Sequence, residues 1–366
     1  MKITSRNTPV IDRFGRPLKI MRISVNHDCN FKCVFCHMEG EDPNIRNYLT
    51  AEEIGIVAEA ASRLGVEKFK ITGGEPTLRR DIVDIVREIK NRAKPKDISM
   101  TTNGTMLEKL AYSLKEAGLD RVNISLHSID PEKFHIITQS KMLNQVLRGL
   151  ETALEAGFKQ VKINMVVMKG FNEQDIVELI ELARKKKLIV QLIELHPVGE
   201  GKKIFSKYHT FLEDLEKKLE KEAKELKIRR DLHNRPIYYF RNGGAVEIVR
   251  PVKNPVFCAA CTRLRLTADG YFKPCLVRND NLVEVKTILR EDIGREEKIE
   301  KVIKAILKAN TLREPSAYWK LGIEKTNGSY KYILQNKLTE YRIQIPKKNG
   351  IDKTVSIEKI YSMIRA

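Results

Sequence analysis

The sequence predicts an α/β fold: a partial, open (βα)6 barrel of the TIM type, followed by a smaller C-terminal α+β domain. From residue 18 to about residue 196, β-like runs alternate with helical patterns, as expected of βα units around a parallel sheet. Six such units are too few to close an eight-stranded barrel. After residue 205 a charged helical stretch leads to short strands and to a second group of cysteines.

The expected strands of the barrel cover residues 18–26, 66–72, 97–102, 121–126, 160–167 and 188–195. Helices with a 3.6-residue period are expected between them. One begins at Thr50, where Glu53 completes a capping box, and the others cover residues 82–92, 107–117, 144–156 and 173–185. Further strands are expected at 237–240, 245–249, 330–334 and 340–345, and a helix at 356–364. We therefore expect domains at 1–205 and 206–312, and an appendix of undisclosed role at 313–366.

The composition limits the possible classes of protein but does not decide between them. The 366 residues carry 67 Lys+Arg against 48 Asp+Glu, a net charge of +19. This charge fits either a polyanionic partner or a Lys/Glu-rich surface like those of heat-adapted proteins. No basic run is interleaved with aromatic residues, as a nucleic-acid platform would require. No run approaches the ~18 apolar residues of a membrane helix and no signal peptide is recognisable, so we expect a cytoplasmic protein.

The most informative motif is the cysteine run Cys29, Cys33 and Cys36. The spacing C-x₃-C-x₂-C gives a [4Fe–4S] cluster three thiolates and leaves one iron open to an outside ligand, which is a catalytic arrangement. The alternatives are a zinc knuckle, with His27 or His37 as the fourth ligand, and disulfides. Disulfides suit a small secreted chain better than one of this length.

The predicted strands alternate polar and apolar residues, whereas strands buried on both faces read as continuous apolar runs. If the apolar face packs on the helices, the polar face lines the barrel interior. Its members are Arg22, Ser24 and Asn26, then Lys68, Lys70 and Thr72, then Asn123 and Ser125, and finally Lys162 and Asn164. We expect an interior that binds a large anionic ligand; the alternative is a partly solvated sheet with polar outer faces.

Two further motifs carry chemistry. In Ile71-Thr-Gly-Gly-Glu-Pro76, two glycines allow close backbone approach and Glu75 can pair with an ammonium group. The second cysteine group consists of Cys258, Cys261 and Cys275, and again leaves one iron open. Between its last two members, Asp269-Gly270 is a hairpin signal, and period-2 alternation places Arg263 and Arg265 on one face. A structural zinc with His233 as fourth ligand is the alternative here.

The cysteine run and the Gly-Gly-Glu segment together resemble the radical S-adenosylmethionine (SAM) enzymes. With Arg22-Ile-Ser-Val25, Thr-Thr-Asn-Gly104 and the second cysteine group, the chain resembles the GTP 3′,8-cyclases of molybdenum-cofactor biosynthesis over about residues 18–280. It differs from that family's pattern at Gln191 and His196, where the family has Arg and Met, and its sequence ends in Ile-Arg-Ala366 rather than Gly-Gly.

The resemblance implies two [4Fe–4S] clusters, on Cys29, Cys33 and Cys36 and on Cys258, Cys261 and Cys275. It implies SAM contacts at Phe35, Gly74, Glu75 and Ser125, and also at His196 if the histidine takes the place of the methionine. It implies GTP contacts at Arg22, Lys70, Thr101, Lys162, Arg263 and Arg265. It also implies the product (8S)-3′,8-cyclo-7,8-dihydroguanosine 5′-triphosphate, a flavodoxin or ferredoxin as electron donor, a downstream cyclic pyranopterin monophosphate synthase, and a homodimer.

Two alternatives remain open at this point. A related radical SAM enzyme with an auxiliary cluster could act on another nucleotide, a peptide or RNA. A zinc-dependent nucleic-acid-binding protein would instead use the positive charge and two cysteine-rich knuckles.

Overall fold

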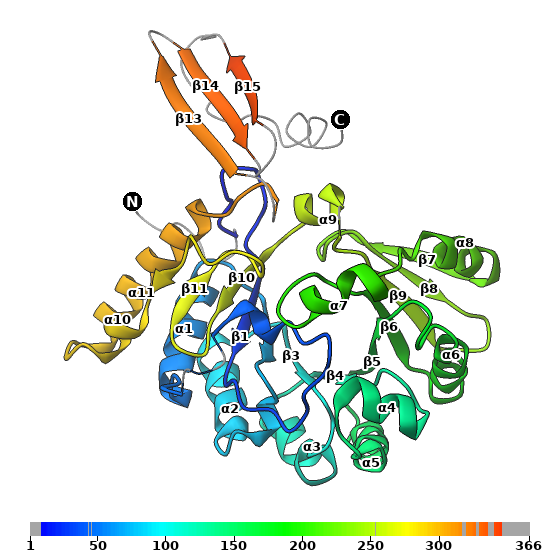
Figure 1. Cartoon of the computed structure of the whole chain (residues 1–366). Helices are drawn as coiled ribbons and strands as arrows, with labels where there is room; N and C mark the ends of the chain where they lie inside the picture. The colour runs from blue at the N-terminus through cyan, green and yellow to red at the C-terminus, as the bar shows by residue number, and fades with distance from the viewer. Residues whose placement is uncertain are drawn as a thin grey trace.

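The computed structural model of the chain describes residues 9–42, 44, 46–252 and 254–316, and three strands beyond them (Figure 1). Six parallel strands lie side by side in chain order, as predicted. They are β1 (Ile20–Ser24), β2 (Lys68–Thr72), β3 (Asp97–Thr102), β4 (Arg121–Ser125), β5 (Gln160–Val167) and β6 (Ile189–Glu194). They form the centre of a twelve-stranded sheet whose two ends are different strands, which confirms an open barrel.

Strands that follow residue 205 extend this sheet at both edges. At one edge β10 (Arg263–Leu266) pairs parallel to β1, and at the other β9 (Ala245–Val249) pairs parallel to β6. Antiparallel strands lie outside them: β11 (Tyr271–Lys273) and β12 (Val283–Glu284) beyond β10, and β8 (Arg235–Tyr239) and β7 (Glu225–Arg229) beyond β9. The strands expected at 237–240 and 245–249 are thus present, and they belong to the same sheet as the barrel.

The predicted helices of the barrel are confirmed to within two residues at either end. They are α1 (Ala51–Arg63), α2 (Ile82–Ala93), α3 (Leu107–Glu116), α5 (Leu143–Glu155) and α6 (Asp175–Lys186). The capping box of Thr50 and Glu53 is formed. The charged helical stretch expected after residue 205 contains α8 (Glu213–Glu222). The structure adds α4 (Pro131–Thr138), α7 (Gly201–Tyr208), α9 (Pro255–Ala259), α10 (Lys286–Arg290), α11 (Arg295–Thr311) and the 3₁₀ turns η1 (Met38–Gly40) and η2 (Pro76–Leu78).

The core lies between the sheet and the helices outside it. Ile23, Phe69, Ile71, Ile124 and Ile163 are all fully buried on the helix side of their strands and belong to one apolar cluster with the inner faces of the helices. The alternating polar positions therefore face the other way, into the barrel. This arrangement places the chemistry-bearing side chains on the concave side of the sheet.

Beyond α11, β13 (Lys320–Thr326), β14 (Ser329–Gln335) and β15 (Glu340–Ile345) form a separate antiparallel sheet, drawn in orange and red at the top of Figure 1. The strands expected at 330–334 and 340–345 are confirmed; the helix expected at 356–364 lies outside the described residues. No helix in the described part of the chain is long and apolar enough to cross a membrane.

Candidate active site

The barrel interior is a cavity of about 400 Å³. Both cysteine groups line it, together with the polar faces of the central strands. Every residue that the resemblance assigned to a cluster, to SAM or to GTP lies in this lining: Arg22, Cys29, Cys33, Phe35, Cys36, Lys70, Gly74, Glu75, Thr101, Ser125, Lys162, His196, Cys258, Cys261, Arg263, Arg265 and Cys275. Residues as far apart in sequence as Arg22 and Cys275 are thus brought to one space. Ser24 and Asn26, which were also expected to face the interior, do not line the cavity.

The first cysteine group lies on the loop that follows β1. The N–H of Cys36 donates to the Cys33 carbonyl at 3.0 Å, and the neighbouring N–H groups of Lys32 and Val34 donate to carbonyls at the end of α4. Burial raises the pKa of the Cys33 thiol, and the nearby thiols of Cys36 and Cys29 raise it further. Three thiols close enough to oppose one another's ionisation need a shared cation to become thiolates together.

Gly73 and Gly74 press against the backbone that leads into this loop. A Cβ at Gly73 would lie 2.4 Å from Asn26 Oδ1, and one at Gly74 would lie 2.4 Å from the Asp28 carbonyl oxygen. The N–H of Gly74 donates to the Asn26 carbonyl at 2.9 Å. These glycines therefore fix the position of the segment before Cys29, since no side chain would fit between the two strands' ends.

The Glu75 carboxylate is buried and already well supplied with donors. Its Oε1 accepts from the Thr77 N–H at 3.0 Å and from Thr102 Oγ1 at 2.7 Å, and its Oε2 accepts from the Asn103 N–H. Burial nevertheless raises its pKa, although these hydrogen bonds oppose the change. An ammonium group at Oε2 would relieve the cost of burying this charge.

Three of the residues expected to contact SAM lie around the loop of the first cysteine group. Phe35 packs edge-on against His127, with ring centroids 4.7 Å apart. Burial lowers the pKa of His127 to about 3, so the ring is neutral and its Nδ1 accepts from the Val166 N–H at 3.1 Å. Burial also lowers the pKa of His196 to about 4, and its Nδ1 has no hydrogen-bond partner among the described residues. Ser125 ends β4 on the cavity side.

The pairing of β10 with β1 places two expected substrate contacts next to each other, because Arg22 and Arg265 are in register. Both bind Glu39: Arg22 Nε donates to Oε2 at 2.9 Å and Arg265 Nη1 donates to the same atom at 2.7 Å. Burial alone would raise the pKa of Glu39, but Arg22, His37 and Arg265 outweigh it and hold the pKa well below its usual range.

At the other edge, Lys162 on β5 forms an ion pair with Glu247 on β9. Burial lowers the pKa of Lys162 to about 8 even though Glu247 opposes the shift. Glu247 also binds Arg229 at 3.2 Å and Arg235 at 3.7 Å. Three cations therefore share one carboxylate here, which leaves positive charge facing the cavity.

Gln191 on β6 lies in register with Glu247. Its Oε1 accepts from Arg235 Nη1 at 3.5 Å. A guanidinium therefore lies beside residue 191, but it belongs to Arg235 of β8, two strands further along the sheet.

Some cations in the cavity are not neutralised at all. The side chains of Lys70 and Arg263 make no hydrogen bond or ion pair with any described residue. Burial lowers the pKa of Lys70 well below its usual range, and Arg22, Arg263 and Arg235 lower it further. Buried polar atoms normally have partners, yet several in this lining have none: Thr101 Oγ1, Glu194 Oε2, His196 Nδ1, His233 Nε2, Arg235 Nε and Arg263 Nε. The interior fits a polar, anionic ligand.

The second cysteine group spans α9 and the hairpin of β10 and β11. Gly270 has φ +89° and its N–H donates to the Thr267 carbonyl at 3.1 Å, which confirms the hairpin predicted from Asp269-Gly270. Leu264 is buried and Arg263 lines the cavity, as the alternation predicts. Burial alone would raise the pKa of the Cys261 thiol, but the guanidiniums of Arg313, Arg16 and Arg263 lower it to about 7. A thiol in such surroundings ionises readily for metal binding.

Among the described residues, no three His, Cys, Asp or Glu side chains converge on a point where one metal ion could sit. The cysteines of a [4Fe–4S] cluster bind separate irons and need no such convergence on one ion. His233, the fourth ligand in the zinc alternative, stacks on Phe257 and has its Nδ1 2.8 Å from the Phe257 carbonyl oxygen, whereas its Nε2 has no hydrogen-bond partner among the described residues.

Sequence reasoning missed Glu39, Arg235 and Glu247. Glu39 reaches Arg22 from a turn in which Met38 and Glu39 have φ of +48° and +50°, a conformation that no local pattern indicates. The sequence does contain an indication of Glu247, because this residue is the single charge in the otherwise apolar strand Ala-Val-Glu-Ile-Val. A charge at an inward position of a core strand marks a partner inside.

Comparison with known proteins agrees with this site. Residues 23–183 match the radical SAM superfamily, and residues 188–316 match the family described as Molybdenum Cofactor Synthesis C. The chain is 47% identical over 313 residues to a probable GTP 3′,8-cyclase of Sulfurisphaera tokodaii, which covers 85% of this chain and 98% of that protein. A probable GTP 3′,8-cyclase of Metallosphaera sedula is 44% identical over 317 residues, covering 86% and 99%.

Solved structures resemble the fold. Streptococcus suis SuiB bound to S-adenosylmethionine matches with a TM-score of 0.58 and 19% identity, over 77% of this chain and 66% of that one. The structure of anSMEcpe with bound AdoMet matches with a TM-score of 0.51 and 17% identity, over 79% and 83%.

Proposed function

This chain belongs to the radical SAM superfamily and, within it, to the GTP 3′,8-cyclase family, and we propose that it converts GTP to (8S)-3′,8-cyclo-7,8-dihydroguanosine 5′-triphosphate. The reaction joins C3′ of the ribose to C8 of guanine, and begins molybdenum-cofactor biosynthesis. The observation that carries the proposal is a single cavity that contains two three-cysteine groups and an excess of buried positive charge. The relatives from S. tokodaii and M. sedula support the same reaction.

Residues of the first half of the chain bind the cofactors of radical formation. Cys29, Cys33 and Cys36 would hold a [4Fe–4S] cluster, which would supply the electron that cleaves SAM into methionine and a 5′-deoxyadenosyl radical. Glu75 receives the ammonium group of SAM, because its buried carboxylate needs compensating charge. Phe35, Gly74, Ser125 and His196 complete the SAM site, with the neutral His196 offering its unpartnered Nδ1.

The triphosphate of GTP binds to the cations that lack full counter-ions. Lys70 and Arg263 are the primary contacts, and Arg235 is the third. Charge-assisted hydrogen bonds from buried guanidinium and ammonium groups are strong, and a polyanion removes the mutual repulsion that now lowers the pKa of Lys70. Thr101 donates its unpartnered hydroxyl to the ligand. Arg22, Lys162 and Arg265 supply the remaining positive charge of the site. Their side chains are held in place by ion pairs with Glu39 and Glu247.

Cys258, Cys261 and Cys275 would hold a second [4Fe–4S] cluster, which would offer a coordination position to the purine. In this division residues 1–205 form the SAM domain, residues 206–312 bring the second cluster, and residues 313–366 form an appendix, of which only residues 313–316 fall within a matched family. A flavodoxin or ferredoxin supplies electrons, a cyclic pyranopterin monophosphate synthase takes the product, and the enzyme is a cytoplasmic homodimer. Family membership supports these last assignments.

The test is an anaerobic reaction of reconstituted protein with SAM, dithionite and either GTP, ATP or cell extract, followed by mass spectrometry. We expect a product isomeric with GTP together with 5′-deoxyadenosine, and about eight iron atoms per chain. Cys29→Ala abolishes 5′-deoxyadenosine formation, whereas Cys275→Ala retains it and loses the cyclised product. Turnover of a component of the extract but not of GTP would assign a different substrate, and about two zinc ions without iron would refute the radical mechanism.

A further inference from the structure

The second cysteine group is held by a buried charge cluster from the two ends of the described chain. An N-terminal turn places Asp12 at its centre: Oδ1 accepts from the N–H groups of Phe14 and Arg16, each at 2.9 Å. Gly15 permits the turn because its φ is +77°. Asp12 Oδ2 then binds Arg16 Nε at 2.7 Å and Arg313 Nη1 at 3.1 Å.

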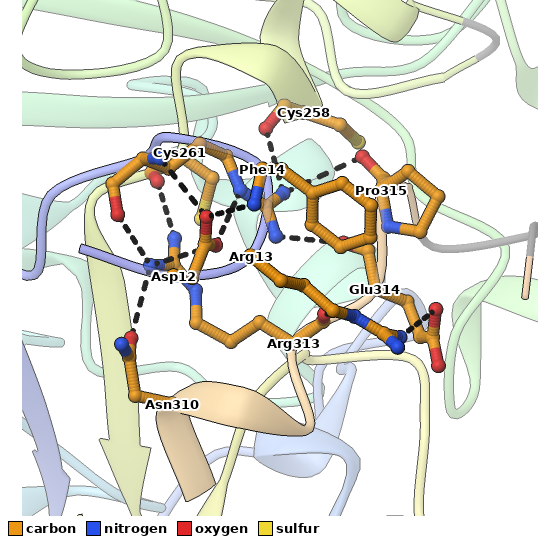
Figure 2. Close-up of polar contacts among 10 residues, drawn as sticks. Asp12, Arg13, Phe14, Cys258, Cys261, Asn310, Arg313, Glu314 and Pro315 are labelled. Carbon is orange, nitrogen blue, oxygen red and sulfur yellow. Dashed lines mark hydrogen bonds and ion pairs between the residues drawn. The ribbon is translucent and has the colours of Figure 1, made fainter. Parts of the chain in front are cut away.

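Both guanidiniums reach from Asp12 to the cysteine loop; Figure 2 labels Asp12, Arg313 and the two cysteines of this cluster. Arg16 Nη1 donates to the Cys258 carbonyl at 3.2 Å, and Arg313 Nη2 donates to the Cys261 carbonyl. Arg16 Nη2 also donates to the Glu314 carbonyl at 2.8 Å, which ties the turn to the segment that follows α11. The backbone on either side of the first two cysteines is thus fixed by two side chains that share one carboxylate.

The two guanidiniums of this cluster are buried next to the second cysteine group. Arg16, Asp12 and Arg313 have side chains only 5%, 0% and 2% exposed, and both guanidiniums bind the Asp12 carboxylate. Arg13 pairs with Glu314 at 2.7 Å. Buried guanidiniums are stabilised by anions beside them. Their hydrogen bonds lead to the carbonyls of Cys258 and Cys261, whose thiols become anionic when they bind a metal.

We propose that Asp12, Arg16 and Arg313 form a charge cap, which positions the Cys258–Cys261 loop and sets the reduction potential of the cluster on the second cysteine group. The proposal rests on the second cluster assigned above. Local net charge and the hydrogen bonds around the ligands are the means by which a protein tunes an iron–sulfur potential. Arg16 and Arg313 are positioning residues, since they act through the cysteines. Their positive charge stabilises the reduced, more negative state.

The test isolates the second cluster in the full chain by replacing Cys29, Cys33 and Cys36 with alanine. EPR-monitored redox titration of this protein gives one midpoint potential. Arg16→Met and Arg313→Met shift it to more negative values, and Asp12→Asn, which keeps its shape and removes a negative charge, shifts it to less negative values. Arg87→Met is the control, because Arg87 pairs with Asp84 at an exposed position of α2, and it leaves the potential unchanged.

The opposite signs separate charge from structural damage, because a merely structural role would move Asp12→Asn and Arg313→Met in the same direction. If Arg313→Met loses its iron, Arg313→Lys and Asp12→Asn still carry the test. A potential unmoved by Asp12→Asn, or moved with the sign of Arg313→Met, overturns the charge cap. A wild-type chain that holds only four iron atoms overturns the second cluster itself, and with it this inference, without touching SAM cleavage.

Discussion

Two buried carboxylates, Glu39 and Glu247, determine how charge is distributed in the cavity at the level of single residues. Each is shared by more than one cation: Glu39 by Arg22 and Arg265, and Glu247 by Lys162 and two arginines. Each carboxylate therefore orients several cations while cancelling the charge of only one. The side chains are held rigid before substrate arrives, which reduces the entropy lost on binding.

Arg235 is expected to contribute to triphosphate affinity although no sequence motif marks it. Arg235→Gln removes a buried guanidinium that donates to the triphosphate. A hydrogen bond to a charged group contributes about 1.5–3 kcal/mol to the binding free energy. Its loss corresponds to a roughly 10–100-fold rise in the Kd of GTP. The Kd of GMP changes less, because fewer phosphates reach the site. Anaerobic isothermal titration calorimetry measures both.

Two further variants sharpen that measurement. Arg148→Gln is the control, since Arg148 pairs with Glu108 at an exposed position outside the cavity lining. The double variant Gln191→Arg with Arg235→Gln returns a guanidinium to the same place from β6, and is expected to recover most of the affinity. Equal losses for GTP and GMP would show that Arg235 does not contact the phosphates.

His127 predicts a pH dependence of stability. Burial lowers its pKa from 6.5 to about 3, whereas the unfolded chain binds the proton near the ordinary value. The unfolded state therefore takes up protons first, so stability is complete above pH 6.5 and falls as the pH drops toward 3. His127→Gln retains an acceptor for the Val166 N–H. The wild type should lose about 2 kcal/mol more than this variant between pH 6.5 and 5, measured by urea unfolding; parallel pH profiles would contradict the assignment.

At the level of elements, the backbone of α5 packs directly against the backbone of the loop after β3. A Cβ on Gly149 would lie 2.1 Å from the Gly104 carbonyl oxygen, and Gly104 itself has φ +84°. The same loop supplies Thr102 and Asn103 to the Glu75 carboxylate. The contact between α5 and this loop thus helps to hold the donors of Glu75, which faces the proposed SAM site.

Gly149→Ala is therefore expected to cost stability and to loosen the SAM site. Moving α5 away from Gly104 costs about 1–3 kcal/mol and displaces the donors of Glu75, so the Kd of SAM rises. Gly294→Ala is the control, because a Cβ at Gly294 meets nothing within 4 Å. Thermal unfolding and SAM binding are measured on both variants. If Gly149→Ala were as stable as Gly294→Ala, α5 would be able to move away from Gly104 without loss of stability.

Sequence periodicity predicted most of the barrel, because alternation along a strand such as β2 is a local property. It also predicted cavity-lining residues such as Lys70 and Lys162, whereas Ser24 and Asn26, on the same predicted face, do not line the cavity. It did not predict the partners of the cavity-lining residues. Glu39 arrives through a left-handed turn and Arg235 through a neighbouring strand, and both depend on contacts remote in sequence. α4 was missed because its cap, Asp130 before Pro131, introduces a helix of only eight residues.

For the whole molecule, the main feature is that strands from the second half of the chain occupy both edges of the central sheet. β1 is covered by β10 and β6 by β9. Exposed edges of parallel strands offer unpaired N–H and C=O groups to other chains. The two matched families are therefore two sequence regions of one folding unit.

A fragment of residues 1–205 is accordingly expected to aggregate or to stay partly unfolded. Size-exclusion chromatography and far-UV circular dichroism of this fragment, beside a fragment of residues 1–316, provide the measurement. The longer fragment contains every strand of the large sheet and is expected to be monodisperse and cooperative in unfolding. A compact 1–205 fragment that unfolds cooperatively would contradict the single-unit view.

The charge cap has a consequence for the order of biosynthesis. Arg13 donates to the carbonyl of Arg313, a residue 300 positions later, and Arg16 contacts the same late segment. During synthesis the N-terminal part of a chain leaves the ribosome first, so Arg13 and Arg16 have left it long before residue 313 is made. The loop of Cys258 and Cys261 acquires its two arginines only when both ends have met. Delivery of iron and sulfide to the second group is thus a late event in the maturation of the enzyme, after translation has passed α11.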